Sequence, residues 1–294
     1  MFYRRKIVFA LLEQFDGGLE RTRLQKLIFL LSQRQSKPNY EFIPHRFGCY
    51  SFSLKADLDV MAQREWLAFD NKTYSPAIEK KYYAELNAMD KQIVLETISN
   101  YGQMSTRAVT THTYINFPYF ASRSTIADEI LPSKYLEKVH NARNMDFTKM
   151  LFTIGYEGIS LEEYLNRLVK NNIKALIDVR KNPLSQKFGF SKKLLQRFCR
   201  RLDIDYIHIP DVGIDSSKRR ELNTQDDYNI LFDDYKKTTL ETSIAAQKEI
   251  LALLEQYQRI ALTCFEAETC QCHRTPLAEK LVTNNSSKIP LKHI

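Results

Sequence analysis

The chain has 294 residues, of which 44% are hydrophobic, so it is long enough for two domains with real cores and too apolar to be disordered throughout. No run approaches the eighteen consecutive apolar residues of a membrane span, and the N-terminus, MFYRRKIVFALLEQF, lacks the small-residue cleavage site of a secretory signal. Five cysteines are an odd number, and only three of them cluster. This usage disfavours a disulfide framework and favours the reducing cytoplasm, with no membrane partner.

Basic residues are concentrated at the start of the chain. Residues 1–55 hold ten Lys or Arg against four acids, a net charge of +6, whereas the whole chain carries +8. Such a segment fits either a nucleic-acid partner, DNA first, or an ordinary solvated face. If nucleic acid binds here, the expected phosphate contacts are six cations of the first two helices: Arg4, Arg5, Lys6, Arg21, Arg23 and Lys26.

The first half of the sequence predicts a mostly helical domain. Apolar residues at helical spacing predict helices over 3–15, around 24–31 and over 54–67, and further helices are expected across 77–103 and 124–140. The stretch AFDNKTYSP, at 68–76, predicts a hairpin or wing after the third helix. Together these elements predict a winged-helix-like domain over 1–145, followed by a polar linker at 141–150. Asp57, Asp59 and Glu65 are expected on the exposed face of the third helix, where acids disfavour contact with DNA.

From residue 150 to 294 the pattern changes to strands that alternate with helices. Strands are expected at 151–154, 175–179, 205–209, 259–264 and 289–294, and Ser160 is expected to cap the first intervening helix. A long helical stretch is expected over 226–257. This alternation predicts an α/β domain with three layers, a parallel sheet between two layers of helices.

The loops after two of these strands carry candidate ligand-binding residues. Parallel sheets bind ligands beyond the carboxyl ends of their strands. After the first strand, GYEG (Gly155, Tyr156 and Gly158 with Glu157) is either an anion-binding loop or a simple tight turn. After the second strand, Asp178 and Arg180 share one face, so Arg180 either binds a phosphate or forms a structural pair with Asp178.

The fourth strand ends in TCFEAETCQCHRTPLAEK, residues 263–280, which allows three kinds of site. The first is an anion site, because His273 and Arg274 precede a helix start with Thr275 as its cap. The second is a catalytic site in which Cys264 or Cys272 is an activated thiol and Glu266 or His273 is the acid or base. The third is a zinc site, although C-x5-C-x-C-H is not a usual pattern. Its ligands would be Cys264, Cys270, Cys272 and His273.

The second half resembles the family catalogued as domain of unknown function 488. The resemblance rests on TIGYEGISLEEYLNRL, IDVRKNPLSQKFGFSKKLL, IDYIHIPDVG, CFEAETCQCHR and the terminal KHI, in that order. It implies a three-layer α/β fold and leaves the reaction open. The residues that match the family signature are Thr153, Gly155, Tyr156, Asp178, Arg180, Pro183, Ser185, Phe190, His208, Gly213, Cys264, Glu266, Cys272, His273 and Arg274. Cys270 lies outside that signature.

The first half is similar to a small helical module of bacterial antitoxin and proteolysis-adaptor proteins. The similarity lies in LQKLIFLLSQ, PHRFGCYSFSLKADLDVM and THTYINFPYFA. It implies a prokaryotic protein with a role in DNA transactions or defence.

Two functions from different classes follow from these features. In the first, the α/β domain binds or processes a nucleotide or nucleic acid: Gly155, Tyr156, Gly158, Arg180 and Arg274 hold the anion, and the catalytic groups are Cys272, His273, Glu266 and Asp178. In the second, the protein is a non-catalytic DNA- or partner-binding regulator that senses a small anionic ligand. A structural zinc protein is a third possibility, and no other cofactor is predicted.

Overall fold

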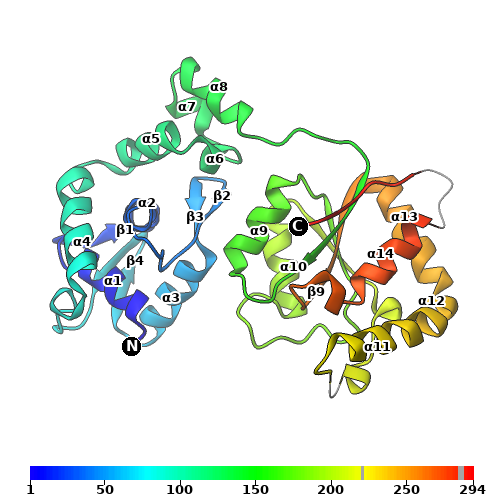
Figure 1. Cartoon of the computed structure of the whole chain (residues 1–294). Helices are drawn as coiled ribbons and strands as arrows, with labels where there is room; N and C mark the ends of the chain where they lie inside the picture. The colour runs from blue at the N-terminus through cyan, green and yellow to red at the C-terminus, as the bar shows by residue number, and fades with distance from the viewer. Residues whose placement is uncertain (220–221, 284–287) are drawn as a thin grey trace. The chain divides into compact units, whose positions relative to one another are not determined.

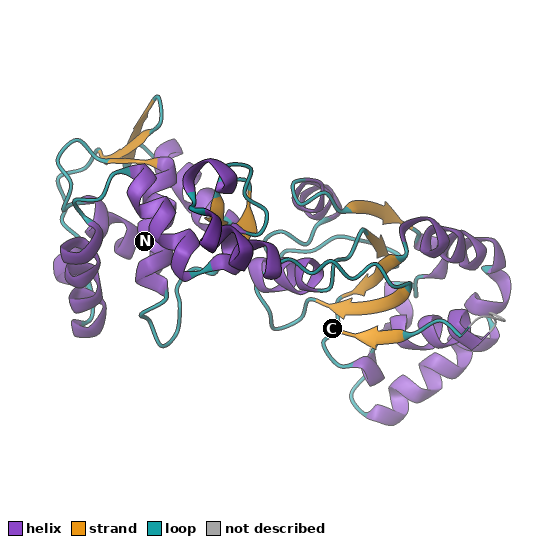
Figure 2. Cartoon of the chain, turned by 90° about the horizontal axis from the view of Figure 1, so that it is seen from above, coloured by secondary structure: helices purple, strands orange, loops and turns teal. Residues whose placement is uncertain are grey.

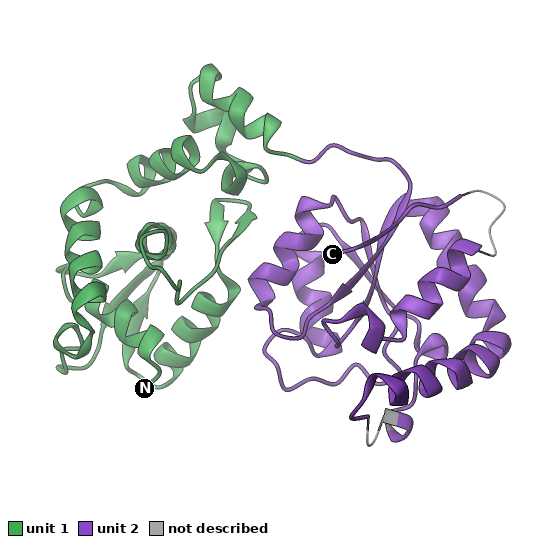
Figure 3. Cartoon of the chain, viewed as in Figure 1, with its two compact units in different colours: residues 1–143 green, residues 144–294 purple. Residues whose placement is uncertain are grey.

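The computed structural model describes residues 1–219, 222–283 and 288–294. The chain divides into two compact units, Met1–Arg143 and Asn144–Ile294, which are coloured separately in Figure 3. No helix in these described ranges is both long enough and apolar enough to cross a membrane.

The N-terminal unit is mainly helical and contains two small antiparallel sheets. Its helices are α1 (Tyr3–Leu12), α2 (Arg21–Ser32), α3 (Phe52–Gln63), the 3-10 helix η1 (Tyr83–Glu85), α4 (Ala88–Tyr101), α5 (Thr106–Asn116), α6 (Pro118–Ala121), α7 (Ala127–Ile130) and α8 (Ser133–Asn141). Its strands are β1 (Leu19–Glu20), β2 (Ile43–His45), β3 (Gly48–Tyr50), β4 (Leu67–Asp70) and β5 (Thr73–Pro76).

The first two helices of this unit are buried over most of their length. Residues 7–12 of α1 and residues 24–32 of α2 are buried, and Ser51 caps α3 by accepting a hydrogen bond from the Leu54 N–H. After α3, β4 and β5 form the predicted hairpin, and β1 joins them to give the strand order β1-β5-β4. Asn71 turns this hairpin with φ 51°, a conformation that Asn tolerates better than most residues.

The later helices of the unit begin and end at other residues than the sequence predicts. The expected helix over 77–103 is α4 alone, preceded by η1, and the expected helix over 124–140 is the two helices α7 and α8. Helix α5 was not expected, because its many threonines are weak helix formers. Ser105 caps α5 and so stabilises its start, and the Thr110 and Thr113 hydroxyls donate to the carbonyls of Thr106 and Thr110 inside the helix.

The C-terminal unit alternates strands and helices, as predicted. Its strands are β6 (Met150–Gly155), β7 (Ala175–Asp178), β8 (Asp205–His208), β9 (Arg259–Cys264) and β10 (Leu291–His293). Its helices are α9 (Leu161–Lys170), α10 (Lys192–Arg200), α11 (Gln225–Lys237), α12 (Thr239–Thr242), α13 (Ile244–Tyr257) and α14 (Arg274–Thr283), with the 3-10 helices η2 (Pro210–Val212), η3 (Ser216–Arg219) and η4 (Thr269–Gln271).

These five strands form one parallel sheet in the order β10-β6-β9-β7-β8. Helices α9 and α10 lie on one side of the sheet and α13 and α14 on the other, as Figures 1 and 2 show. Alternate residues of the strands face the two helical layers. Ile177 of β7 packs into the core with α13 and α14, whereas Thr263 of β9 accepts a hydrogen bond from the Tyr164 hydroxyl of α9. The prediction of an α/β fold with a parallel sheet is therefore confirmed.

Two helix boundaries in this unit differ from the prediction. The stretch 226–257 is interrupted between α11 and α13, where the Thr238 and Thr242 hydroxyls donate to the carbonyls of Asp234 and Thr238. Helix α14 begins at Arg274, so Thr275 lies inside it and donates its hydroxyl to the Thr269 carbonyl instead of acting as the cap. Ser160 caps α9 as expected, accepting from the Glu163 N–H.

Candidate functional site

The loops that follow β6, β7 and β9 surround one pocket of about 280 Å³. They meet because β9 lies between β6 and β7, with Gly155 opposite Cys264 and Asp178 opposite Thr263. The pocket is lined by Tyr156, Arg180, Lys181, Asn182, Leu184, Ser185, Ile214, Cys264, Phe265 and His273. Of the residues expected to bind ligand or to catalyse, Tyr156, Arg180, Cys264 and His273 reach this pocket.

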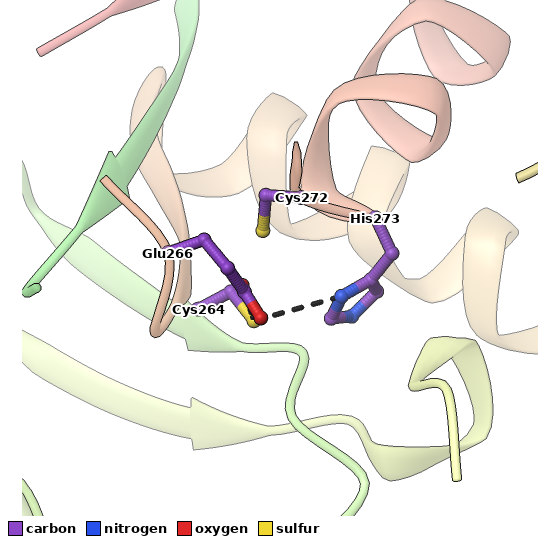
Figure 4. Close-up of side chains that lie close together, drawn as sticks. All are labelled: Cys264, Glu266, Cys272 and His273. Atoms are coloured by element: carbon purple, nitrogen blue, oxygen red, sulfur yellow. Dashed lines mark hydrogen bonds between the residues drawn. The ribbon is translucent and has the colours of Figure 1, made fainter. Parts of the chain in front are cut away.

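A cluster of four side chains, Cys264, Glu266, Cys272 and His273, adjoins the pocket (Figure 4). Cys264 ends β9 and Glu266 follows it, whereas Cys272 and His273 come from the segment before α14. One potential ligand atom of each side chain lies within 4.8 Å of those of the other three. The Cys264 thiol lies 3.1 Å from a carboxylate oxygen of Glu266 and 3.5 Å from Nδ1 of His273.

The hydrogen bonds of His273 define which ring nitrogen carries its proton. Nε2 lies 3.1 Å from the Val179 carbonyl, which can only accept, so Nε2 holds the proton and donates it. Nδ1 faces the Cys264 sulfur, and in the neutral form of the ring it is the nitrogen without a proton. This arrangement can serve two kinds of chemistry: a base beside a thiol nucleophile, or a nitrogen ligand beside a sulfur ligand of one metal ion.

The structure argues against Cys272 as the nucleophile. Its side chain is fully buried and does not line the pocket, so a substrate in the pocket does not reach it. Burial and the neighbouring Cys264 and Glu266 raise the pKa of the Cys272 thiol, which disfavours the reactive thiolate. Cys270 is exposed and is not part of the cluster, so Glu266 takes the place of Cys270 in the four-residue set considered for zinc.

Two amides of the GYEG turn support the loop that carries Glu266 and are not presented to an anion. The N–H groups of Tyr156 and Glu157 both donate to the Phe265 carbonyl, at 3.0 and 2.9 Å. A Cβ at Gly155 would lie 1.9 Å from the Glu266 carbonyl oxygen, so only glycine allows this approach. Gly158 has φ +75° and serves the turn itself. The assignment of Gly155 to an anion site is therefore corrected to a structural role, whereas the assignment of Gly158 stays a prediction.

Arg274 is also occupied within the protein. It is 1% exposed, and its guanidinium donates to the backbone carbonyls of Glu266 and Ala267, at 2.5 and 3.1 Å. It does not line the pocket. Nη1 and Nη2 therefore shape the 264–267 loop, whereas the buried Nε has no hydrogen-bond partner among the described residues. Because the side chain does not reach the pocket, its assignment as a phosphate ligand there is corrected.

Asp178 and Arg180 form a buried ion pair at the end of β7. Asp178 is 0% and Arg180 6% exposed, and two nitrogens of the guanidinium lie 2.8 and 2.5 Å from the two carboxylate oxygens. Arg180 also donates to the Tyr156 hydroxyl and the Phe190 carbonyl, and Asp178 accepts from the Tyr206 hydroxyl. Burial alone would lower the pKa of Arg180, but its bonds to Asp178 raise it. Of the two roles considered for Arg180, the geometry supports the structural pair. Asp178 is buried in that pair and does not line the pocket, so the geometry lends no support to its predicted catalytic role.

Most of the six cations expected to contact nucleic acid are bound within the N-terminal unit. Lys26 is 1% exposed and donates to the Phe47 and Cys49 carbonyls, and burial lowers its pKa. Arg4 and Arg5 both pair with Asp57, and Lys6 pairs with Glu85. Arg23 donates to the Gly102 carbonyl, and Arg21 is exposed. Arg5 and Lys26 are therefore wrong as phosphate contacts, because both are buried.

The prediction that Asp57 is exposed on the third helix is also wrong. Asp57 is 2% exposed and accepts hydrogen bonds from Arg4, Arg5 and Tyr40. Its charge therefore offsets the basic N-terminus from inside the unit and does not repel DNA at a helix surface.

The sequence reasoning missed four exposed residues of the pocket, and Lys181 and Phe265 are the two among them that can bind a charged or aromatic group. Lys181 directly follows Arg180, and Phe265, 43% exposed, directly follows Cys264. The signal that could have identified them is their position, one residue beyond side chains already selected at a strand end. Tyr156 lies behind Phe265: its ring stacks on Phe190 at 4.2 Å between centroids and meets Phe265 edge-on at 5.3 Å.

Fold and site together define a protein with an α/β unit that carries a polar pocket and a Cys/His/Glu cluster at the carboxyl edge of a parallel sheet. Residues 160–281 match the model of the family described as "Domain of unknown function DUF488", which confirms the resemblance of the C-terminal half. The match includes Arg180, the cluster and Arg274, and it ends inside α14. A search of curated proteins found no match to the chain.

Proposed function

We propose that the C-terminal unit binds a nucleotide, either free or within a nucleic acid, in the pocket beyond β6, β7 and β9, and processes it there. The observation that carries this proposal is the pairing of an exposed aromatic ring, Phe265, with an exposed lysine, Lys181, beside Cys264 and His273. A nucleotide needs both features, because its base stacks on aromatic rings and its phosphate attracts a cation.

The size of the pocket supports a small ligand. Its volume of about 280 Å³ lies near the lower end of the range for ligand sites, which suits a single nucleotide or a smaller group better than a dinucleotide. Since Arg180 and Arg274 are bound internally, Lys181 is the pocket cation we assign to the phosphate. This assignment replaces the two arginines by a residue whose side chain is exposed.

Binding of a nucleotide panel to the full-length protein, measured by calorimetry, tests this proposal. Phe265→Ala should weaken binding about 5- to 150-fold, the effect of losing roughly 1–3 kcal/mol of base stacking. Lys181→Gln should weaken binding of phosphorylated ligands and leave nucleosides unaffected. Phe147→Ala and Lys248→Gln are matched controls, because both side chains are exposed in the same unit and lie outside the pocket. Failure of every nucleotide and nucleoside to bind would reject the proposal.

A non-catalytic sensor is the second candidate, and the internally bound arginines favour it. Enzymes that transfer phosphoryl groups place cations directly on the phosphate, whereas Arg180 donates to Asp178, Tyr156 and Phe190. A sensor would bind its ligand and release it unchanged. Chromatography of each binding nucleotide after incubation with the protein separates the two functions, since only an enzyme yields a product.

For the N-terminal unit we propose a nucleic-acid-binding, winged-helix-like role. Its support is the element order α1, β1, α2, β2, β3, α3, β4, β5, in which β5 pairs with both β1 and β4 as a wing does. Arg21 and Lys72, at the ends of β1 and of the β4–β5 turn, are exposed cations suited to phosphate contact. A gel-shift titration against salt tests this role: a steep fall in affinity is expected, and a flat log–log slope would exclude phosphate contacts.

A further inference from the structure

The cluster of Cys264, Glu266, Cys272 and His273 brings two thiols, an imidazole and a carboxylate to one point from two separate segments (Figure 4). Cys264, Cys272 and His273 are 0–2% exposed. We propose that these four side chains bind one zinc ion, through both sulfurs, Nδ1 of His273 and a carboxylate oxygen of Glu266.

The distances within the cluster are close to those of a tetrahedral zinc site. Zinc binds sulfur at about 2.3 Å and imidazole nitrogen at about 2.0–2.1 Å, so tetrahedral angles separate the S and N ligands by about 3.5 Å and two S ligands by about 3.8 Å. The observed separation of Cys264 Sγ and His273 Nδ1 is 3.5 Å. The widest separation allowed within the cluster, 4.8 Å, exceeds these edges by about 1 Å, which a side-chain rotation covers.

The surroundings of His273 are those of a metal ligand. A histidine that binds a metal through one nitrogen donates the other N–H to a carbonyl or carboxylate, which fixes the ring. Here Nε2 donates to the Val179 carbonyl at 3.1 Å, and Nδ1 faces Cys264.

Charge also balances at the cluster. Two thiolates and a carboxylate around Zn²⁺ leave one net negative charge, and the guanidinium of Arg274 lies close enough to Cys272 to act on it electrostatically. Arg274 is held in place by the carbonyls of Glu266 and Ala267, within the loop that supplies two of the ligands.

The ligand set selects zinc over other common ions and favours a metal over a simple thiol–imidazole pair. Two sulfurs and a nitrogen are soft or borderline ligands, whereas Mg²⁺ and Ca²⁺ require oxygen. A catalytic pair needs Cys264 and His273 only, and it leaves the fully buried Cys272 beside them without a role. Zinc uses all four side chains.

Four protein ligands leave no open position, so the ion is structural. It joins the end of β9 to the start of α14 and thereby fixes Cys264 and His273, which form part of the pocket wall. This inference does not depend on the nucleotide proposal, since the ion can be present whether or not a nucleotide binds.

Elemental analysis of the full-length protein, purified in reducing buffer without added metal, tests the site. We expect about one zinc per chain. Cys264→Ser, Cys272→Ser and Glu266→Gln should each reduce zinc affinity by at least 10- to 100-fold, which is the cost of losing only a group that is hydrogen-bonded to a metal ligand. Cys270→Ser is the matched control, because this exposed cysteine lies in the same loop, two residues from Cys272, and should leave the zinc content unchanged.

Cobalt substitution gives a second measurement that does not depend on how the variants fold. Wild-type protein stripped of metal and reloaded with Co²⁺ should show the intense visible absorption of tetrahedral sulfur coordination. If the wild-type protein contains no zinc and shows no such cobalt spectrum, the proposal is overturned. Unchanged zinc content in folded Cys272→Ser or Glu266→Gln protein would do the same.

Discussion

Removal of the Arg180 side chain distinguishes a structural ion pair from a ligand-binding arginine. In the Arg180→Ala variant, Asp178 keeps its charge at 0% exposure and loses both guanidinium contacts. The Tyr206 hydroxyl and the backbone N–H of residue 180 are the hydrogen bonds described here that remain to it. Breaking a buried pair by deleting one partner costs about 3–5 kcal/mol, because the other charge stays buried and uncompensated.

Removing one partner of an exposed ion pair costs much less stability, so an exposed pair serves as the control. Lys149 and Glu255 lie in the same unit at 2.8 Å, with 28% and 57% of their side chains exposed. Lys149→Ala should cost no more than about 1 kcal/mol. Arg180→Lys should fall between these values, since an ammonium keeps the charge but cannot reproduce the planar fork that spans Asp178, Tyr156 and Phe190.

Urea unfolding followed by far-UV circular dichroism measures these differences. The single tryptophan, Trp66, lies in the N-terminal unit, so its fluorescence provides a reference transition from the unit that carries no substitution. On heating, Arg180→Ala should lower the Tm of the C-terminal unit by about 6–20 °C, at roughly 2–4 °C per kcal/mol for a unit of this size. A cost below about 1 kcal/mol combined with loss of nucleotide binding would refute the structural role and restore Arg180 as a phosphate ligand.

Three further predictions concern the backbone and the N-terminal unit. Gly155→Ala should unfold the C-terminal unit or displace the 264–267 loop, because the new Cβ would lie 1.9 Å from the Glu266 carbonyl oxygen. Gly158→Ala meets open space and should cost only roughly 1–2 kcal/mol of stability, because of its positive φ. Thermal melts of the two variants measure this difference. Burial raises the pKa of Tyr74 to about 12, so the unfolded chain loses the phenol proton first, at about pH 10. The stability of the N-terminal unit should therefore fall as the pH rises from about 10 to 12. Unfolding followed by tryptophan fluorescence should show a smaller fall in stability for Tyr74→Phe. Lys26→Met should destabilise the N-terminal unit and leave the salt dependence of DNA binding unchanged. Arg21→Gln should reduce the slope of log affinity for DNA against log salt concentration by about one. An equal effect of both substitutions on this slope would contradict the buried position of Lys26.

The sheet and the meeting of its loops could be predicted from the sequence because both depend on local patterns. Buried apolar runs such as ALID at 175–178 alternate with helices that carry an apolar stripe, and this alternation requires a parallel sheet. Parallel strands all end at one edge, so Tyr156, Arg180 and His273 were expected together before their distances were known. Cys270 and Cys272 could not be told apart by spacing, since which of them faces Cys264 depends on the turn of η4.

The ion pairs of the N-terminal unit could not be predicted, because the partners come from distant parts of the chain. The basic segment 1–55 is offset by acids that follow it: Asp57 pairs with Arg4 and Arg5, Glu85 with Lys6, and Glu96 with Arg34. A charge count along the sequence suggests that these cations bind a partner molecule, whereas in the folded chain they pair with acids of the same unit. The local count therefore overestimates the positive surface available to DNA.

The residues that carry the family resemblance in this chain converge on one loop, and this convergence shows what the sequence pattern maintains. Gly155 permits the close approach of β6, the Tyr156 and Glu157 N–H groups donate to the Phe265 carbonyl, and Arg274 donates to the next two carbonyls. A loop at a strand end has few backbone partners of its own, so each of these bonds removes conformational freedom that would otherwise misplace Glu266. Substitutions at these positions should therefore disturb the geometry of the Cys/His/Glu cluster before they disturb the sheet. Loss of zinc from folded Arg274→Lys protein, with the secondary structure retained, is the expected result, and full zinc content in that variant would mean that the loop holds its shape without the guanidinium.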